Sequence, residues 1–256
     1  DHSDAKLLIT DTQFSPTMKK ALQIYGKNIP IIDIHDDQAV FKDGEGEKIG
    51  EMTYEEFLQT GDDNYNWSLP EDEWQAISLS YTSGTTGKPK GVVYHHRGSY
   101  LMSTGSVTAW NMPNKLTFLY TVPMFHCNGW GYPWTAALIH AKIICCRYIV
   151  AKDIYNLIDK YKVTHFGGAP IVLSLIANAD EKDKKEINHK VYVLTAGAPP
   201  TSAILEKMDN LGFEVMHVYG LTETYGHILQ CAWNEEWESQ SKSEKADIKA
   251  RQGVRY

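Results

Sequence analysis

Short apolar runs alternate along this chain with stretches of helical periodicity, and this alternation restricts the fold more than any other feature. Because the apolar content of the runs is near-continuous, they are typical of strands covered on both faces. Strands that alternate with helices favour an α/β fold with largely parallel sheets and flanking helices. We predict strands at 6–10, 29–34, 76–81, 117–122, 142–146, 163–166, 191–196 and 213–219, and helices near 15–25, 97–110, 152–161, 170–180 and 201–210.

Two segments depart from this alternation. Residues 36–75 are acidic and contain glycine, which predicts a surface excursion rather than core. Within them, Thr53 and Glu56 precede Phe57 at the spacing of a capping box, which predicts a helix start. Residues 233–252 mix Glu, Lys and Ser, which predicts an exposed helix.

Charge and composition exclude several classes of function. The 256 residues carry 25 Lys and Arg against 32 Asp and Glu, a net charge of −7, so the chain has no general attraction for nucleic acid or an anionic membrane. No apolar run reaches the roughly 18 residues of a transmembrane segment, and residues 1–4 do not resemble a signal peptide. The four cysteines fit neither a disulfide framework nor a zinc pattern. These features predict a cytoplasmic protein with small-molecule partners; they leave its oligomeric state open.

A glycine-rich segment follows the strand predicted at 76–81. It reads Tyr-Thr-Ser-Gly-Thr-Thr-Gly-Lys-Pro-Lys-Gly over residues 81–91. Glycine lets the backbone approach an anion, successive N–H groups form an anion-binding nest, and hydroxyls and lysines add donors and charge. The spacing differs from a Walker A motif, because two residues separate Gly84 from Gly87 and Pro89 follows Lys88. The segment therefore predicts a triphosphate-binding loop and disfavours a P-loop NTPase or a kinase.

Three later stretches accompany this loop: Pro-Met-Phe-His at 123–126, Thr-Ala-Gly-Ala-Pro-Pro at 195–200 and Tyr-Gly-Leu-Thr-Glu-Thr at 219–224. In this order, the four stretches resemble the adenylate-forming (AMP-binding) superfamily. The His-Cys-Asn-Gly-Trp run at 126–130 and the Trp-rich segment before residues 251–255 are similar to those of short- and medium-chain fatty acyl-CoA synthetases. The resemblance implies that a carboxylic acid reacts with ATP and Mg²⁺ to give an acyl-adenylate. Coenzyme A then displaces AMP to give a thioester.

The resemblance also assigns roles in the nucleotide site. The phosphate cradle would comprise Thr82, Ser83, Gly84, Thr85, Thr86, Gly87, Lys88, Pro89 and Lys90, of which Lys90 either binds phosphate or anchors the loop. The adenine side would comprise Gly197, Ala198, Pro199, Tyr219 and Gly220, with Tyr219 stacked on the ring and His217 near the substrate carboxylate. Thr222 would contact phosphate and Glu223 would bind Mg²⁺, which prefers hard oxygen ligands.

The acyl side of the site follows from the same resemblance. A histidine after Pro-Met-Phe is either a core residue or a gate between nucleotide and acid, and the resemblance favours the gate for His126. Trp130 would limit the depth of the acyl tunnel and favour short acids. The tunnel walls would comprise Cys127, Asn128, Gly129, Trp130, Gly167 and Gly168, and the catalytic set Lys88, His126, Thr222 and Glu223.

Two alternatives stay open. One is a catalytically incomplete nucleotide-binding module; the other is a ligase for an aryl or methylthio-alkanoic acid. The superfamily carries a Thr-Gly-Asp motif and a lysine-bearing C-terminal domain downstream of these stretches, and neither follows within residues 225–256. Residues 1–256 are therefore expected to be part of the large N-terminal adenylation domain, with little adenylating activity by themselves.

Overall fold

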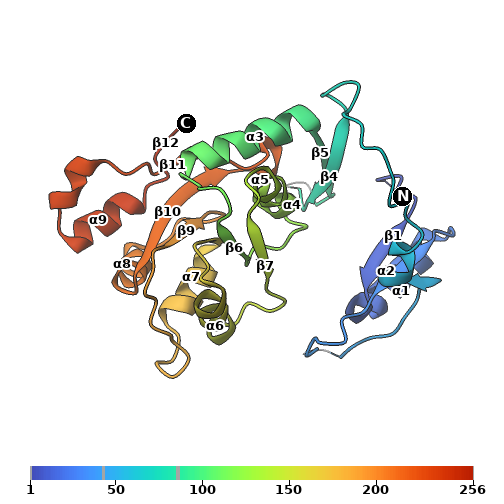
Figure 1. The fold of residues 1–256 in the computed structure, drawn as a ribbon, viewed down its shortest axis with the longest axis horizontal. Coiled ribbons are helices and arrows are strands. Elements are labelled where there is room, and N and C mark those ends of the chain that lie inside the picture. The colour runs from blue at the N-terminus through green and yellow to red at the C-terminus, as the bar shows by residue number, and fades with distance from the viewer. Residues whose placement is uncertain (1, 42–43, 85–86, 256) are drawn as a thin grey trace. The chain divides into compact units, whose positions relative to one another are not determined.

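The chain forms two compact units, Asp1–Leu69 and Pro70–Tyr256. The computed structural model describes residues 2–41, 44–84 and 87–255 (Figure 1). Thr85 and Thr86, both assigned to the phosphate cradle, lie outside the described residues.

The first unit builds a small parallel sheet next to two helices. Its strands are β1 (Leu8–Asp11), β2 (Ile31–Ile34) and β3 (Met52–Thr53), paired in that order. A 3-10 helix (Thr12–Phe14), α1 (Ser15–Tyr25) and α2 (Tyr54–Leu58) complete it. Pro16 in the first turn and Gly26 directly after the last turn set the limits of α1, which match the helix predicted near 15–25. The capping box between Thr53 and Glu56 is confirmed, because each residue caps the other's backbone N–H.

A buried carboxylate organises the loop of this unit. The side chain of Asp33 on β2 accepts hydrogen bonds from the backbone N–H groups of Ile49, at 3.0 Å, and Gly50, at 2.7 Å. Asp33 is only 1% exposed, so these hydrogen bonds replace the hydrogen bonds to water that the carboxylate loses on burial. None of the described residues between 36 and 75 is buried, which confirms the predicted surface excursion over that part of the chain.

The second unit is built on a seven-stranded sheet in the order β12-β11-β10-β9-β8-β6-β7. The five strands from β10 to β7 in this order are parallel, whereas β11 pairs antiparallel with β10, and β12 pairs antiparallel with β11. The bounds are β6 (Thr117–Tyr120), β7 (Lys142–Cys145), β8 (His165–Gly168), β9 (Val191–Thr195), β10 (Phe213–Gly220), β11 (His227–Gln230) and β12 (Val254–Arg255).

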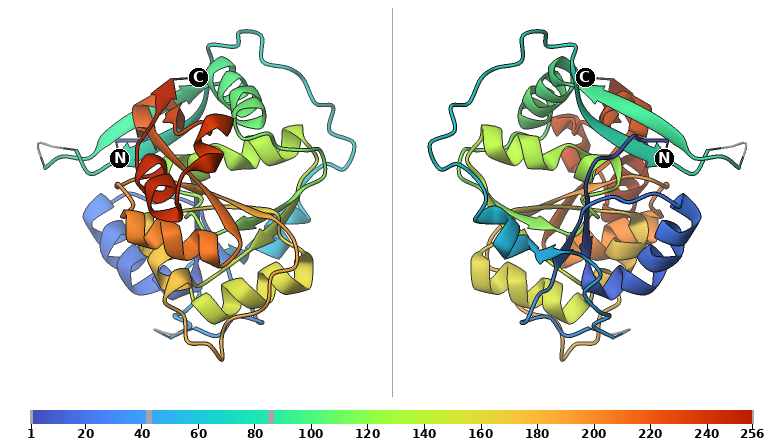
Figure 2. Two further views of the ribbon diagram at one scale, coloured as in Figure 1. Left: turned by 90° about the vertical axis from the view of Figure 1, so that its left-hand side faces the viewer. Right: turned by 90° about the vertical axis from the view of Figure 1, so that its right-hand side faces the viewer.

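Helices cover both faces of this sheet (Figures 1 and 2). On one face, Phe118 and Tyr120 of β6 pack with Trp110 and Tyr132, whereas Leu119 points into a second cluster on the other face. This alternation explains why the strands read as near-continuous apolar runs. The helices are α3 (His96–Ala109) and α5 (Tyr132–Leu138) on the first face, and α6 (Ala151–Tyr161), α7 (Pro170–Ala177), α8 (Ser202–Asn210) and α9 (Lys242–Lys249) on the second.

Two segments of this unit differ from expectation. The strand predicted at 76–81 is β4 (Ala76–Thr82), but it pairs antiparallel with β5 (Lys90–His95) in a separate two-stranded ribbon and leaves Ile77 and Leu79 each 37% exposed. The predicted helix at 233–252 divides into a 3-10 helix (Glu235–Ser239) and α9, because Ser241 starts a new helix with its own capping box. Ala246 of α9 is buried in the core, so this helix is only partly exposed.

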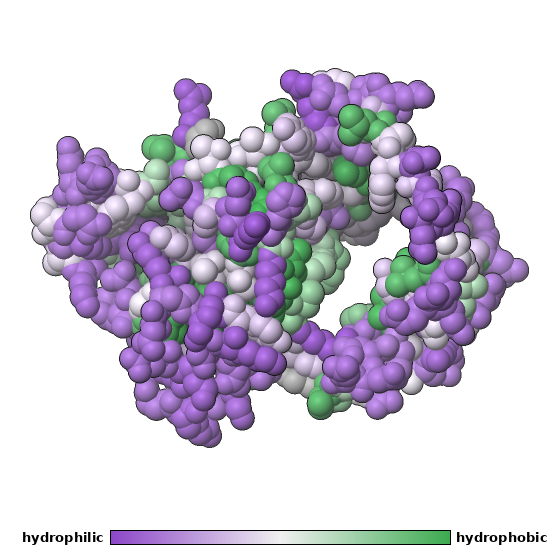
Figure 3. Space-filling model, viewed as in Figure 1, coloured by the Kyte–Doolittle hydropathy of each residue, from purple (hydrophilic) through white to green (hydrophobic). Residues whose placement is uncertain are grey.

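The hydropathy of the surface differs from one part of the second unit to another. Figure 3 shows hydrophilic residues over the charged loop 180–186 between α7 and β9, at the bottom of the view. In the described part of the chain, no helix combines the length and the apolarity needed to cross a membrane.

Candidate active site

A small cavity lies in the second unit at the carboxyl ends of β9 and β10, and its volume is about 180 Å³. Ligands of open α/β sheets bind at this end of the strands. The cavity brings together residues from three of the stretches singled out in the sequence. Its lining comprises His126, Cys127, Trp130, Leu194, Ala196, Gly197, Val218, Gly220, Leu221, Thr222, Gly226 and His227.

Gly220 allows the chain to turn back along the cavity. The register between β10 and β11 shifts at Tyr219 and Gly220, and a Cβ at position 220 would collide with the backbone of Gly226 and His227. Only glycine lets the two strands approach this closely. The turn presents Thr222 and Glu223 on a 3-10 helix (Thr222–Thr224) directly after β10.

The segment that follows His126 has an unusual backbone. Residues 127–131, which include α4 (Cys127–Trp130), form a left-handed turn, with φ of +45° at Cys127, +43° at Asn128 and +57° at Trp130. L-residues other than glycine cost roughly 1–2 kcal/mol each in this conformation. The turn aims Cys127 and Trp130 into the cavity wall, with His126 beside them. Such strain persists only where the surrounding structure over-determines the backbone.

Thr222 connects this turn to the second nucleotide stretch. Its hydroxyl lies 3.1 Å from the Cys127 sulfur, and its backbone carbonyl accepts a 2.6 Å hydrogen bond from the Tyr94 hydroxyl on β5. Burial raises the pKa of the Cys127 thiol, so the thiol stays protonated and can share a hydrogen bond with the threonine. Burial likewise raises the pKa of Tyr94. Glu223 is exposed and does not line the cavity.

An aromatic pair fixes the ribbon of β4 and β5 to the same stretch. The rings of Tyr94 and Tyr225 stack with their centroids 4.2 Å apart, and the Tyr225 hydroxyl accepts a 3.0 Å hydrogen bond from the backbone N–H of His95. Tyr225 also packs so closely on Gly98 that a Cβ there would lie 2.5 Å from its ring. The ribbon is thereby held next to Thr222 and Glu223.

The predicted phosphate loop connects the two strands of this ribbon. Thr82 and Lys90 pair across its base, so Lys90 is the first residue of β5, next to the loop. Gly84 has φ of +66°, and a Cβ there would collide with the carbonyl of Lys88. Lys88 is exposed, as are Ser83, Gly87 and Pro89. None of the described loop residues lines the cavity.

Several other predicted residues lie near the cavity without lining it. Gly167 lies behind Trp130, since a Cβ there would come within 3.3 Å of the indole ring, and Gly168 is the last residue of the same strand, β8. Gly129 lies against Tyr120, whose hydroxyl donates a 3.3 Å hydrogen bond to the carbonyl of Gly129. Ala198, Pro199 and Tyr219 are also absent from the lining.

Two residues that were predicted to line the substrate site lie elsewhere in the structure. His217 is 1% exposed and its Nδ1 lies 2.9 Å from the carbonyl of Ala250, so it faces the end of α9 and not the cavity. Burial lowers its pKa. The parity of β10 explains the difference, because Val218 points to the cavity and its neighbour must point to the opposite face. Asn128 does not wall the cavity either; its side chain contacts β4.

Six lining residues have no role predicted from the sequence: Leu194, Ala196, Val218, Leu221, Gly226 and His227. Of these, Ala196 and Leu221 lie within the motif stretches 195–200 and 219–224. Val218 has a usable signal, since it lies two residues before Gly220 on β10 and therefore shares its face, and Leu194 has the same spacing to Ala196, directly after β9. His227 is 6% exposed, and burial lowers its pKa to about 4, so it is neutral near pH 7. The position of His227, three residues after Thr224, gives no periodic signal because of the turn between β10 and β11.

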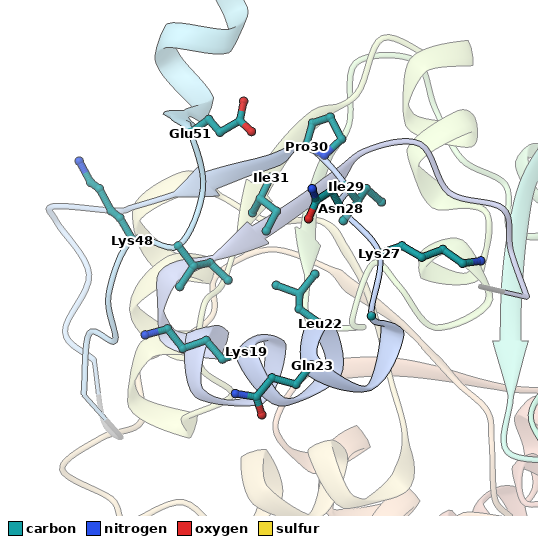
Figure 4. A pocket seen from close by; sticks show the side chains of 12 residues that line it. Lys19, Leu22, Gln23, Lys27, Asn28, Ile29, Pro30, Ile31, Lys48 and Glu51 are labelled. Atoms are coloured by element: carbon teal, nitrogen blue, oxygen red, sulfur yellow. The ribbon is translucent and has the colours of Figure 1, made fainter.

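A larger hollow of about 1050 Å³ lies in the first unit (Figure 4). Leu22 and Ile31 point into its centre, while Lys19, Lys27 and Lys48 end at separate places around it. Lys19 is paired with Glu47 at 2.6 Å. No predicted site residue lines this hollow.

Comparison with known proteins identifies the family. A family model described as AMP-binding enzyme matches residues 1–248, which is nearly the whole chain. The chain belongs to the AMP-binding enzyme family. This membership accounts for the order of the motif stretches and for the α/β architecture.

Curated relatives within the family are named as CoA ligases. An acetate/butyrate–CoA ligase of Arabidopsis thaliana, named as peroxisomal, is 43% identical over 264 residues, covering 100% of this chain and 46% of the relative. An acetate–CoA ligase of Humulus lupulus is 44% identical with the same coverage. A 2-methylpropanoate–CoA ligase of Humulus lupulus is 39% identical over 256 residues, 99% of this chain and 46% of the relative. The chain thus spans about half the length of the relatives it matches.

Solved structures share the fold at low sequence identity. A luciferase-like enzyme from the mealworm Zophobas morio has a TM-score of 0.73 at 20% identity, covering 94% of this chain and 53% of that one. An O-succinylbenzoate CoA synthetase of Bacillus subtilis, solved with ATP and magnesium, has a TM-score of 0.63 at 21% identity, covering 88% and 46%. The fold is that of the N-terminal region of adenylate-forming enzymes, as the sequence predicts.

Proposed function

We propose that the protein to which this chain belongs is an AMP-forming acid–CoA ligase that activates a short-chain carboxylic acid. In the first half-reaction, a carboxylate oxygen of the acid attacks the α-phosphorus of ATP, and the bond to pyrophosphate breaks. In the second, the thiol of coenzyme A attacks the acyl carbon, loses its proton, and displaces AMP. Family membership and the names of the curated relatives support this reaction class.

The size of the cavity carries the choice of a short acid. Its volume of about 180 Å³ lies below the roughly 300–1,000 Å³ of pockets that take drug-sized ligands. Trp130, Leu194 and Val218 give it apolar walls, and Thr222 and the two histidines give it polar ones. An acid with a short alkyl chain fits this division of apolar and polar walls, and a long-chain acid does not fit the volume. The acetate, butyrate and 2-methylpropanoate named for the relatives are acids of this kind.

The chain's own residues have separate tasks in this proposal. Lys88, Thr82 and Ser83, with the loop backbone, bind the phosphates and hold their negative charge near the incoming carboxylate. The exposed carboxylate of Glu223, on the turn next to the ribbon, fits a Mg²⁺ ligand, because it makes no hydrogen bond or ion pair with any of the described residues. Bound there, the metal supplies positive charge that offsets the repulsion between carboxylate and triphosphate. His126 contributes to the rim of the cavity, where it gates access between acid and nucleotide.

ATP-dependent pyrophosphate exchange by the full-length protein tests the proposal directly. We expect exchange with acetate, butyrate and 2-methylpropanoate, and little with benzoate or 3-methylthiopropanoate. Lys88→Ala should lose exchange, while Lys152→Ala, at an exposed lysine of α6, should keep it. ATP binding without exchange for any acid would support a catalytically incomplete module instead. A preference for benzoate would contradict the short-chain assignment.

The compartment is a separate matter. A cytoplasmic location stays a prediction from the sequence, and one of the relatives is named as peroxisomal. Imaging of the tagged full-length protein against a peroxisomal marker distinguishes the two.

A further inference from the structure

The side chain of Asn128 connects the left-handed turn to the strand that precedes the phosphate loop. Its Oδ1 accepts hydrogen bonds from the hydroxyls of Ser78, at 2.7 Å, and Ser80, at 2.9 Å. Both serines lie on β4, which runs beside α4 (Figure 1). Ser80 is 3% exposed, so its bond is shielded from water. One amide oxygen therefore holds two points of the strand.

The two serines are placed so as to orient the beginning of the phosphate loop. Alternate residues of a strand share a face, so Ser78, Ser80 and Thr82 point the same way. Thr82 is the first residue of the loop stretch and pairs with Lys90 at the base of the ribbon. The ribbon does not pair with the seven-stranded sheet, so its position in the second unit depends on side-chain contacts of this kind.

The other side of the same turn forms the wall of the cavity. Cys127 and Trp130 line it on either side of Asn128, and the Cys127 sulfur lies 3.1 Å from the hydroxyl of Thr222. A group that fills the cavity contacts Cys127 and Trp130, whose backbone is strained and left-handed. Any shift of that turn moves the acceptor of Ser78 and Ser80.

We propose that Asn128 is a positioning residue that couples occupation of the cavity by the acid to binding of ATP at the phosphate loop. This inference rests on the proposed function. The acid stabilises the turn, the turn fixes β4 through Asn128, and β4 presents the loop in its phosphate-binding arrangement. Coupling of this kind is reciprocal, so ATP strengthens acid binding by the same factor.

Calorimetric binding of α,β-methylene-ATP to the full-length protein tests the coupling, because this analogue cannot form an adenylate. Its affinity is measured with Mg²⁺, with and without saturating butyrate. In the wild type we expect butyrate to tighten binding by about tenfold. Asn128→Gly keeps the left-handed backbone and removes the acceptor, and the S78A/S80A double variant removes both donors from the other strand. Both should reduce the coupling factor to below about twofold, within the range of lost hydrogen bonds.

Three controls make the result specific. Asn128→Asp keeps an acceptor oxygen and should keep the coupling. Asn111→Gly replaces another left-handed asparagine, with φ of +47° and an exposed side chain, and should change nothing. Combining Asn128→Gly with S78A/S80A should cause no further loss, since all three changes remove the same contacts.

Two results would overturn the inference: a wild type without coupling, or Asn128→Gly and S78A/S80A variants that both retain it. If Asn128→Gly does not fold, the serine variant decides alone. Failure of the proposed function has a different signature, namely the lack of pyrophosphate exchange with every acid in the wild type.

Discussion

Two buried histidines should make this chain sensitive to mild acid. His165 is 1% and His227 6% exposed, and burial lowers the pKa of each from 6.5 to about 4. Between these values the unfolded chain binds protons that the folded chain does not, so stability is full above pH 6.5 and is lost as the pH falls toward 4. The difference amounts to about 3 kcal/mol per histidine in full, and to about 2 kcal/mol each at pH 5.

His165→Phe isolates one of the two contributions. The imidazole stacks on Tyr192 at 4.9 Å and meets the edge of Trp110 at 5.0 Å, so another aromatic ring can occupy the site. Urea unfolding of the 256-residue chain, followed by far-UV circular dichroism at pH 7.5 and pH 5, measures the loss. The variant should lose about 2 kcal/mol less than the wild type over this interval. His140→Asn, at an exposed histidine, should lose as much as the wild type. Equal losses in the wild type and the His165→Phe variant would refute the reasoning.

Three further predictions concern the site and the first unit. Trp130→Ala in the full-length protein should move the acid preference to longer chains, gaining about fourfold in kcat/KM per added methylene, while Trp130→Phe keeps the short preference; an unchanged acyl profile would contradict the wall. Glu223→Gln should lower kcat on the order of 100-fold with little change in the KM for the acid, and excess Mg²⁺ should restore part of the rate; a wild-type rate would remove Glu223 from the metal site. Asp33→Ala should destabilise the first unit by about 2–3 kcal/mol in urea unfolding, because backbone N–H groups of the loop lose a charged acceptor; a change below about 0.5 kcal/mol would show that water replaces it.

Local signals made part of this fold predictable. The limits of α1 follow from Pro16 and Gly26, and α2 follows from Thr53 and Glu56, all within one or two turns of the helix they control. The apolar runs predict the parallel strands of the second unit, because a strand with helices packed on both of its faces needs apolar residues on both. Such features depend on neighbours in sequence or on a burial pattern that every residue of the strand shares.

Features that depend on distant pairing were not predictable in this way. The ribbon of β4 and β5 is held apart from the main sheet by two contacts, one between Ser78 and Asn128 and one between Tyr94 and Tyr225. Each contact joins residues that lie far apart in sequence. The short strand β11 exists because the edge of β10 is available to pair with it, and β12 pairs in turn with β11. In the site, family resemblance pointed to Cys127 and Trp130, but the direction of each side chain depends on the left-handed backbone.

The left-handed turn also limits how this protein can be improved by engineering. Replacing Trp130 with glycine would relieve roughly 1–2 kcal/mol of backbone energy, but it would also remove the packing of the indole against the core, and loss of a packed aromatic side chain costs roughly 3–5 kcal/mol. The same replacement would remove an aromatic wall from the cavity. Selection for thermal tolerance and selection for turnover are therefore both expected to keep tryptophan at this position, in spite of its backbone conformation.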